Sequence, residues 1–150
     1  MLKMDDPSNQ TLQYALKLLA ARDFSQAELR RKLQARFGDV PQSVIETLLA
    51  RRFLDDRRFA ENYVARRPNR AAARLRGELI QRGIEPSIID AVLSGPGRPS
   101  LHEVVKATMV DWGLRPPLQP RDAARLFRAL ARLGYDEDAI REEVETLNAQ

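Results

Sequence analysis

Residues 75–93, LRGELIQRGIEPSIIDAVL, and residues 126–144, LFRALARLGYDEDAIREEV, share one pattern without a gap. In both, a pair of leucines at helical spacing is followed by a glycine and then by an isoleucine. Helical spacing on both sides of a glycine predicts two helices joined by a tight turn. Residues 29–49, LRRKLQARFGDVPQSVIETLL, repeat the pattern with two extra residues, Phe37 and Gly38. Three copies of one pattern predict three similar structural units.

Start and stop signals for helices surround these copies. Ser25 with Glu28, and Ser100 with Glu103, have the spacing of a capping box. Glycines that follow apolar segments, where a left-handed residue can end a helix, are Gly38, Gly83, Gly95, Gly113 and Gly134. No segment keeps the apolar and polar alternation of a strand. The expected helices lie near residues 11–21, 26–37, 42–52, 55–67, 70–82, 86–94, 100–112, 120–133 and 136–148.

We therefore expect an all-α fold of about nine helices. Short helices with one apolar stripe must bury it on their neighbours, so we expect an elongated tandem array of three three-helix units, similar to helix-turn-helix modules. A single compact helical bundle is the alternative. The expected parts are a polar N-terminal tail and three repeats, over residues 1–10, 11–53, 54–97 and 98–150.

The composition excludes several classes of protein. Of 150 residues, 43% are hydrophobic, which is enough for a core. The absence of cysteine excludes disulfides, thiolate catalysis and the usual zinc sites, and His102 alone cannot make a multi-histidine metal site. We therefore expect no enzyme activity, no cofactor and no metal. A polar start and the lack of a long apolar segment predict a cytoplasmic protein, not bound to membranes, which we expect to be a monomer.

The net charge of +4 hides an uneven distribution. Residues 22–82 carry 14 arginines and Lys32 against eight acidic residues, a net charge of +7, and the remaining residues have a net charge of −3. Arginine forms forked contacts with phosphate and carboxylate groups, so an anionic partner is expected for the basic part. The densest cluster contains Arg66, Arg67, Arg70, Arg74 and Arg76. A second candidate surface contains Arg30, Arg31, Arg36, Arg51, Arg52, Arg57 and Arg58. The alternative is that these arginines only solvate helix faces.

Residues 53–64, FLDDRRFAENYV, form the most distinctive segment. Asp55 can cap the following helix, Asp56 favours its positive end, and Phe59 and Tyr63 lie one turn apart on a face that we expect to be buried. A metal site at the two aspartates is not expected, because no histidine is near and two arginines follow.

This segment also resembles the Leu-Asp-Asp-x-Arg-Phe-Ala-x-x-Tyr motif of the RecX family, the bacterial regulators of the RecA recombinase. The matching residues are Leu54, Asp55, Asp56, Arg58, Phe59, Ala60 and Tyr63. Residues 15–33 look like the family's opening motif, and Glu78, Leu79 and Gly83 look like its second-repeat motif. The resemblance covers residues 11–93 well and the third repeat loosely. Arg52 stands where the family often has a glycine turn.

The resemblance implies a non-enzymatic regulator that lies in the helical groove of the RecA filament on single-stranded DNA. It would inhibit RecA's ATP hydrolysis, strand exchange and co-protease activity, and so regulate recombinational DNA repair and the SOS response. The implied partners are the RecA filament and, in some relatives, DNA. The residues alone leave a second hypothesis, a nonspecific DNA-binding protein, although residues 42–51 and 86–93 lack the polar pattern that reads base edges.

Overall fold

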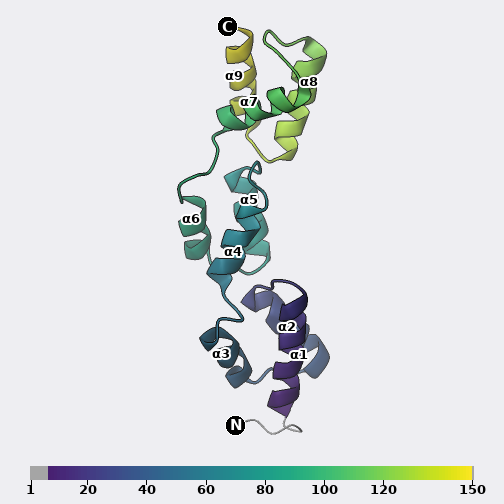
Figure 1. The fold of residues 1–150 in the computed structure, drawn as a ribbon, viewed down its shortest axis with the longest axis vertical. Helices are drawn as coiled ribbons and strands as arrows, with labels where there is room; N and C mark the ends of the chain where they lie inside the picture. The colour runs from purple at the N-terminus through teal and green to yellow at the C-terminus, as the bar shows by residue number, and fades with distance from the viewer. Residues whose placement is uncertain (1–6, 150) are drawn as a thin grey trace. The chain divides into compact units, whose positions relative to one another are not determined.

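The computed structural model describes residues 7–149, and within them the chain forms nine α-helices and no strand (Figure 1). The helices are α1 (Pro7–Ala21), α2 (Gln26–Phe37), α3 (Gln42–Ala50), α4 (Asp56–Ala65), α5 (Ala72–Gln81), α6 (Pro86–Leu93), α7 (Leu101–Trp112), α8 (Pro120–Arg132) and α9 (Glu137–Asn148). The predicted all-α class is therefore confirmed. None of these helices is long and apolar enough to cross a membrane.

The start of α1 differs from the prediction. The helix begins at Pro7, four residues before the expected start, so residues 7–10 are helical and do not belong to a tail. Proline is favourable in the first helical turn because its missing N–H has no partner there in any helix. The buried Thr11 hydroxyl donates to the Pro7 carbonyl oxygen at 2.8 Å, which satisfies its hydrogen-bonding capacity within this turn. The rest of the predicted tail, residues 1–6, lies outside the described residues.

The helix ends follow the local signals at all but one of the expected positions. Both serine capping boxes form, each with reciprocal contacts between the serine and its glutamate. Four of the five glycines have positive φ, but the prediction for Gly95 was wrong, because the left-handed residue in that loop is Gly97, with φ of 90°. Pro96 follows Gly95, and the residue before a proline is restricted to extended conformations.

The repeated pattern places its apolar residues in the core. The leucine pairs and the isoleucine of all three copies are fully buried: Leu29, Leu33, Ile45, Leu75, Leu79, Ile89, Leu126, Leu130 and Ile140. Each such side chain contributes about 1.5 to 3 kcal/mol through burial. The same sequence positions therefore perform the same structural role in each repeat.

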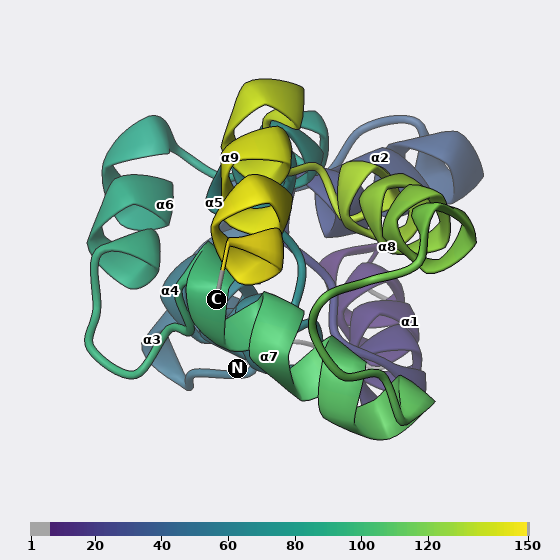
Figure 2. The ribbon, with the colours of Figure 1, turned by 90° about the horizontal axis from the view of Figure 1, so that it is seen from above.

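The described residues divide into two compact units. One contains residues 7–63 and 78–92, and the other contains residues 64–77 and 93–149, so the second repeat contributes to both units. In the first unit, α1 packs against α2 and α3. In the second, α8 packs against α9, and α7 contacts both (Figure 2).

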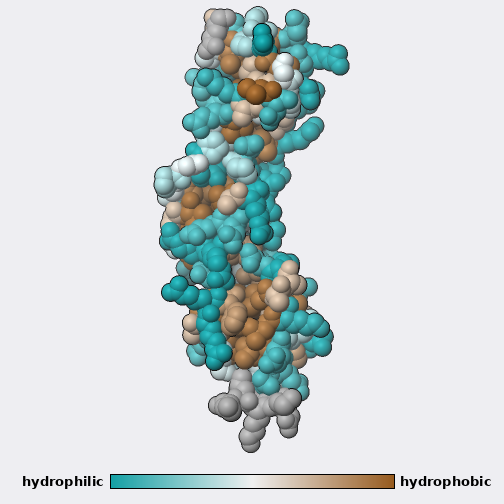
Figure 3. All heavy atoms as spheres, in the orientation of Figure 1, coloured by the Kyte–Doolittle hydropathy of each residue, from teal (hydrophilic) through white to brown (hydrophobic). Residues whose placement is uncertain are grey.

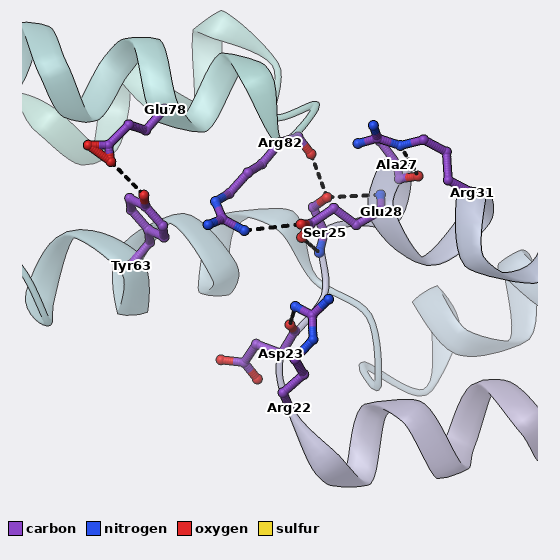
Figure 4. A network of polar contacts seen from close by, with 9 residues as sticks. All are labelled: Arg22, Asp23, Ser25, Ala27, Glu28, Arg31, Tyr63, Glu78 and Arg82. Carbon is purple, nitrogen blue, oxygen red and sulfur yellow. Dashed lines mark hydrogen bonds and ion pairs between the residues drawn. The ribbon is translucent and has the colours of Figure 1, made fainter.

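The first and second repeats meet through a contact that we call the first joint. The Ser25 hydroxyl, at the start of α2, donates to the main-chain carbonyl oxygen of Arg82 at 2.6 Å (Figure 4). The next residue, Gly83, has φ of 83°, and a Cβ atom there would lie 2.4 Å from the Cβ of Ala27. Glycine is therefore required at this position for two reasons, the left-handed backbone and the close approach to α2.

A second joint, between the second and third repeats, uses equivalent positions. The backbone N–H of Ala71 donates to the carbonyl oxygen of Leu133 at 2.9 Å. A Cβ atom on Gly134 would lie 2.6 Å from the Cβ of Arg74, which follows Ala73, the residue at the position of Ala27. In the repeat pattern, Ala71 takes the place of Ser25, and Leu133 takes the place of Arg82. The end of one repeat's second helix thus meets the start of the preceding repeat's second helix, twice along the chain.

Candidate interaction surfaces

The densest arginine cluster lies in one compact unit. Arg66 and Arg67 follow α4, Arg70 lies in the loop before α5, and Arg74 and Arg76 belong to α5. Arg66, Arg74 and Arg76 are exposed, whereas Arg67 and Arg70 are half-buried. The loop is held by Arg98, whose Nη2 donates to the Arg70 carbonyl oxygen at 2.9 Å. The cluster therefore presents several guanidinium groups on a loop with defined main-chain contacts.

Arg74 forms a long-range hydrogen bond that the sequence did not predict. Its Nη1 donates to the carbonyl oxygen of Arg132 at the end of α8. A positive charge at the C-terminal end of a helix is favourable, because the last carbonyl groups carry partial negative charge. Arg74 therefore helps to form the second joint, and its replacement would disturb the fold as well as any surface.

The second set of arginines lies in the other unit. Arg58 donates to the carbonyl oxygens of Arg52 at 2.9 Å and Phe53 at 3.4 Å, and so closes the turn between α3 and α4. Arg52 has φ of 59°, a left-handed conformation that favours glycine, the residue expected from the motif. Arg57 pairs with Glu61 at 2.9 Å, an exposed ion pair that contributes little to stability.

Three of these arginines line one hollow of about 760 Å³ in the first unit. Arg30, Arg52 and Arg57 face it together with three acidic residues, Asp55, Asp56 and Glu85. The charges in the hollow are therefore mixed. Arg31 lies outside this set and donates from Nε to the Ala27 carbonyl oxygen at 3.4 Å.

The two adjacent aspartates have different structural roles. Asp55 accepts from the backbone N–H of Arg58 at 3.1 Å, which confirms its predicted capping role. Asp56 accepts from the backbone N–H of Gln26 at 2.8 Å and so ties α4 to α2. Burial raises the pKa of Asp56 above its usual value, and the charges of Asp55, Glu85 and Glu28 raise it further, although the bond from Gln26 opposes the change. No group of three acidic or histidine residues among residues 7–149 could hold a metal ion.

Aromatic and polar contacts hold the distinctive segment in the first unit. Phe59 and Tyr63 are buried and stack with ring centroids 6.2 Å apart. The Tyr63 hydroxyl donates to Oε2 of Glu78 at 2.6 Å, and the Arg82 guanidinium lies 5.0 Å from the Tyr63 ring centroid (Figure 4). Arg82 also pairs with Glu28 at 3.1 Å. Leu54, Ala60 and Leu79 are fully buried. The segment that carries the family resemblance therefore builds the first joint.

An apolar depression lies in the same unit. A hollow of about 460 Å³ is lined by Leu16, Leu19, Phe24, Phe53 and Phe59, with charged residues at its margin. Phe53 remains 47% exposed. Apolar side chains gather in a depression over this part of the chain in Figure 3.

The third repeat contains exposed arginines that the sequence analysis did not select, because the net charge of this part of the chain is negative. Along α8, Arg121, Arg125, Arg128 and Arg132 are all exposed and recur at helical spacing. The acidic residues of α9 cancel them in any net-charge count, but helical spacing alone could have found them. Arg125 stacks on Trp112 at 3.9 Å from the ring centroid, and Trp112 packs on the core of this unit. The single histidine, His102, contacts Glu143 at 2.9 Å.

Known proteins are similar to this chain in sequence and in fold. Residues 12–51 match the first three-helix domain of RecX, and residues 55–93 match the second. The regulatory protein RecX of Leptothrix cholodnii is 36% identical over 131 residues, which cover 85% of this chain and 83% of the relative. The chain belongs to the RecX family. The RecX proteins of Serratia proteamaculans and Thermus thermophilus are 30% and 40% identical, over 88% and 57% of this chain and over 94% and 61% of their own.

A solved structure shows the same fold as this RecX family member. The crystal structure of RecX from Lactobacillus salivarius aligns with a TM-score of 0.68 and covers 96% of this chain and 98% of its own. The sequences are only 16% identical, so this likeness concerns the fold alone. The two matched domains contain both of the arginine sets that the sequence singled out, except for Arg52, which lies between them.

Proposed function

We propose that this protein is a non-enzymatic, cytoplasmic regulator of RecA. It binds the RecA filament on single-stranded DNA along the filament's helical groove. From there it inhibits RecA's ATP hydrolysis, strand exchange and co-protease activity, and thereby regulates recombinational DNA repair and the SOS response. The observation that carries the proposal is membership of the RecX family, with relatives at 30% and 36% identity over most of the chain.

The charge of the matched domains supports an anionic binding partner. Arg66 and Arg76 are exposed in the dense cluster, and Arg57 is exposed at the start of α4. Guanidinium groups at exposed positions can form forked contacts with the carboxylate or phosphate groups of a partner. We assign the contact surface to Arg66, Arg67, Arg70 and Arg76, with Arg30, Arg31 and Arg57 as a second region. Arg58 and Arg74 act through the turn and the joint that they stabilise.

Nonspecific DNA binding is the second candidate function. The exposed arginines of α8 favour it, because they extend the positive surface beyond the two matched domains. Contacts of this kind neutralise phosphates without reading base sequence. A protein that used only such contacts would bind DNA without RecA, and its affinity would fall steeply with salt, by about one logarithmic unit of slope per phosphate neutralised.

RecA activity measurements test the proposal directly. Single-strand-dependent ATP hydrolysis and strand exchange should both decrease when the protein is present at a stoichiometric ratio to RecA. Unchanged RecA activity at that ratio would overturn the proposal. Tight salt-sensitive binding to DNA in that case would instead support the second candidate. A salt titration with and without RecA measures this difference.

A further inference from the structure

The first joint shows which structure packs against the start of a repeat's second helix. On the first repeat, Ala27 receives Gly83 of the second repeat. Around this contact, Gln26, Arg30 and Leu49 line one hollow together with Glu85 and Ile88 of the second repeat. The contact depends on a glycine turn that approaches the small side chain of Ala27 closely. A helix end with a glycine turn is therefore what the face formed by these first-repeat residues binds.

The third repeat has the same face, but no repeat follows within the described residues to cover it. A groove of about 360 Å³ between α8 and α9 is lined by Ala123, Ala124, Phe127 and Val144. In the repeat pattern these residues occupy the positions of Gln26, Ala27, Arg30 and Leu49. The groove is mostly apolar, includes alanine where the first joint has Ala27, and is flanked by Arg128, Arg141 and Glu145.

The first repeat has an uncovered glycine at the end of its second helix. Its main-chain contacts differ from those of the internal joints: the N–H of Asp39 donates to the Phe37 carbonyl oxygen, whereas Ile84 and Tyr135 donate to Leu79 and Leu130. At the end of α2, Gly38 has φ of 80°, and a Cβ atom there would meet nothing within 4 Å. The two equivalent turns, at Gly83 and Gly134, are both in close contact with a preceding repeat. Gly38 and Asp39 are exposed. The chain thus carries both halves of a joint, a groove at one repeat and a turn at another.

We propose that a second copy of this chain inserts its Gly38 turn into the groove between α8 and α9. The contact repeats the two joints already present within each chain. It joins unlike surfaces, so copies associate head to tail, into a closed ring or an open chain of molecules. Repeat proteins extend in this way unless their terminal faces are polar, and the groove in the third repeat is mostly apolar. The association needs neither RecA nor DNA and is independent of the proposed function.

Charge complementarity supports this occupant. Asp39 lies beside Gly38 in the turn. Arg36 lies in the last turn of α2, but its guanidinium stacks on the Tyr14 ring, 4.4 Å from the ring centroid. The groove presents the guanidinium groups of Arg128 and Arg141 at its margin, which together outweigh the single carboxylate of Glu145. Arg141 already contacts Asp138 at 2.9 Å, an exposed pair that a stronger contact can replace. The turn carries Phe37 where the other repeats have glycine, so we expect this joint to be weaker than the internal joints.

A charge exchange between two variants tests the proposal. The average mass of the wild-type protein in sedimentation equilibrium should rise from the monomer value of 17.1 kDa as concentration increases. Asp39→Arg and Arg128→Asp should each remain monomeric, because like charges then meet in the joint. A mixture of the two variants should associate again, because each turn then finds a groove of opposite charge. Wild-type protein that stays monomeric at its highest soluble concentration would overturn the proposal.

A groove-filling variant provides an independent control. Ala124→Trp should abolish the association, whereas Ala107→Trp, at an exposed position of α7 outside the groove, should leave it unchanged. Helical circular dichroism should be the same for both variants. Equal association of Ala124→Trp and the wild type would also overturn the proposal, because the groove would then not be the interface.

Discussion

The Ser25 hydroxyl donates a hydrogen bond to the carbonyl oxygen of Arg82, 57 residues away, at 2.6 Å. The Ser25 hydroxyl oxygen also accepts from the backbone N–H of Glu28 at 3.1 Å, so one hydroxyl both caps α2 and holds the first joint. A hydroxyl can donate one bond and accept others, and Ser25 uses both capacities in a fully buried position.

Ser25→Ala should therefore destabilise the protein by more than the loss of a cap. The cap contributes about 1 kcal/mol, and the lost bond to the Arg82 carbonyl adds about another 1 kcal/mol. Ser100→Ala is a matched control, because Ser100 forms the other capping box and is exposed. It should cost about 1 kcal/mol. Urea unfolding followed by circular dichroism measures both values, and equal losses would show that the Arg82 contact contributes nothing.

Gly83→Ala should lower stability for two reasons, backbone strain and a steric clash with α2, and a control glycine can separate the two costs. Alanine at φ of 83° is strained, which costs about 1 to 2 kcal/mol, and its Cβ would also collide with Ala27. Gly113→Ala is the control, because Gly113 has a left-handed φ of 68° and open space around the added atom, so it should show only the strain. We expect Gly83→Ala to cost at least about 2 kcal/mol more, in the range of an overpacked core. The double variant Gly83→Ala with Ala27→Gly should recover part of the loss, and a failure to recover would argue against the contact.

Local signals predicted the helices and their ends because the signals and the structures they form lie within a few residues. Ser25 and Glu28 are three residues apart, and the capping box that they form needs no other part of the chain. The contacts that assemble the repeats could not be predicted in this way. Asp56 binds Gln26 across 30 residues, and Arg74 binds Arg132 across 58. Aspartate and arginine occur in many surface roles, so the residue type alone does not predict such a contact. The sequence therefore placed Arg74 with the candidate binding arginines, although it also stabilises the second joint through Arg132.

Arg52→Gly should stabilise the protein. Arg52 has φ of 59°, and the left-handed conformation costs a residue with a side chain about 1 to 2 kcal/mol. Glycine avoids this cost but loses more backbone entropy on folding, so the net gain should be roughly 0.5 to 1 kcal/mol. Arg51→Gly is the control, because Arg51 has φ of −90° and its replacement removes a similar charge. It should destabilise slightly. Similar effects of the two substitutions in urea unfolding would contradict the strain at Arg52.

Asp56→Asn should change how stability depends on pH. Burial raises the pKa of the folded-state carboxyl above its usual value of 3.8, so ionised Asp56 lowers stability at neutral pH. As the pH falls through the raised pKa toward 3.8, protonation in the folded state removes this cost. Asparagine can still accept the bond from Gln26 but has no charge. The variant should be at least as stable as the wild type at pH 7, and this advantage should shrink toward about pH 4. Parallel stability curves over that range would contradict the predicted shift.

Charge reversal at two exposed arginines should weaken inhibition of RecA without unfolding the protein. Arg66→Glu with Arg76→Glu changes the dense cluster but keeps Arg74, whose contact with Arg132 stabilises the second joint. If this cluster faces an anionic surface, reversal replaces attraction by repulsion, and inhibition should require at least about tenfold more protein. RecA's single-strand-dependent ATP hydrolysis, titrated with each variant, measures the change.

The matched control reverses two exposed basic residues outside the cluster and outside α8, Lys106→Glu with Arg115→Glu. Both double variants change the net charge by the same amount, so a general electrostatic effect would weaken them equally. A loss confined to the first variant, with unchanged helical circular dichroism, assigns the contact to the cluster. Equal inhibition by the first variant and the wild type would move the binding surface elsewhere, and Arg31 and Arg57, both exposed in the second region, would be the next residues to reverse.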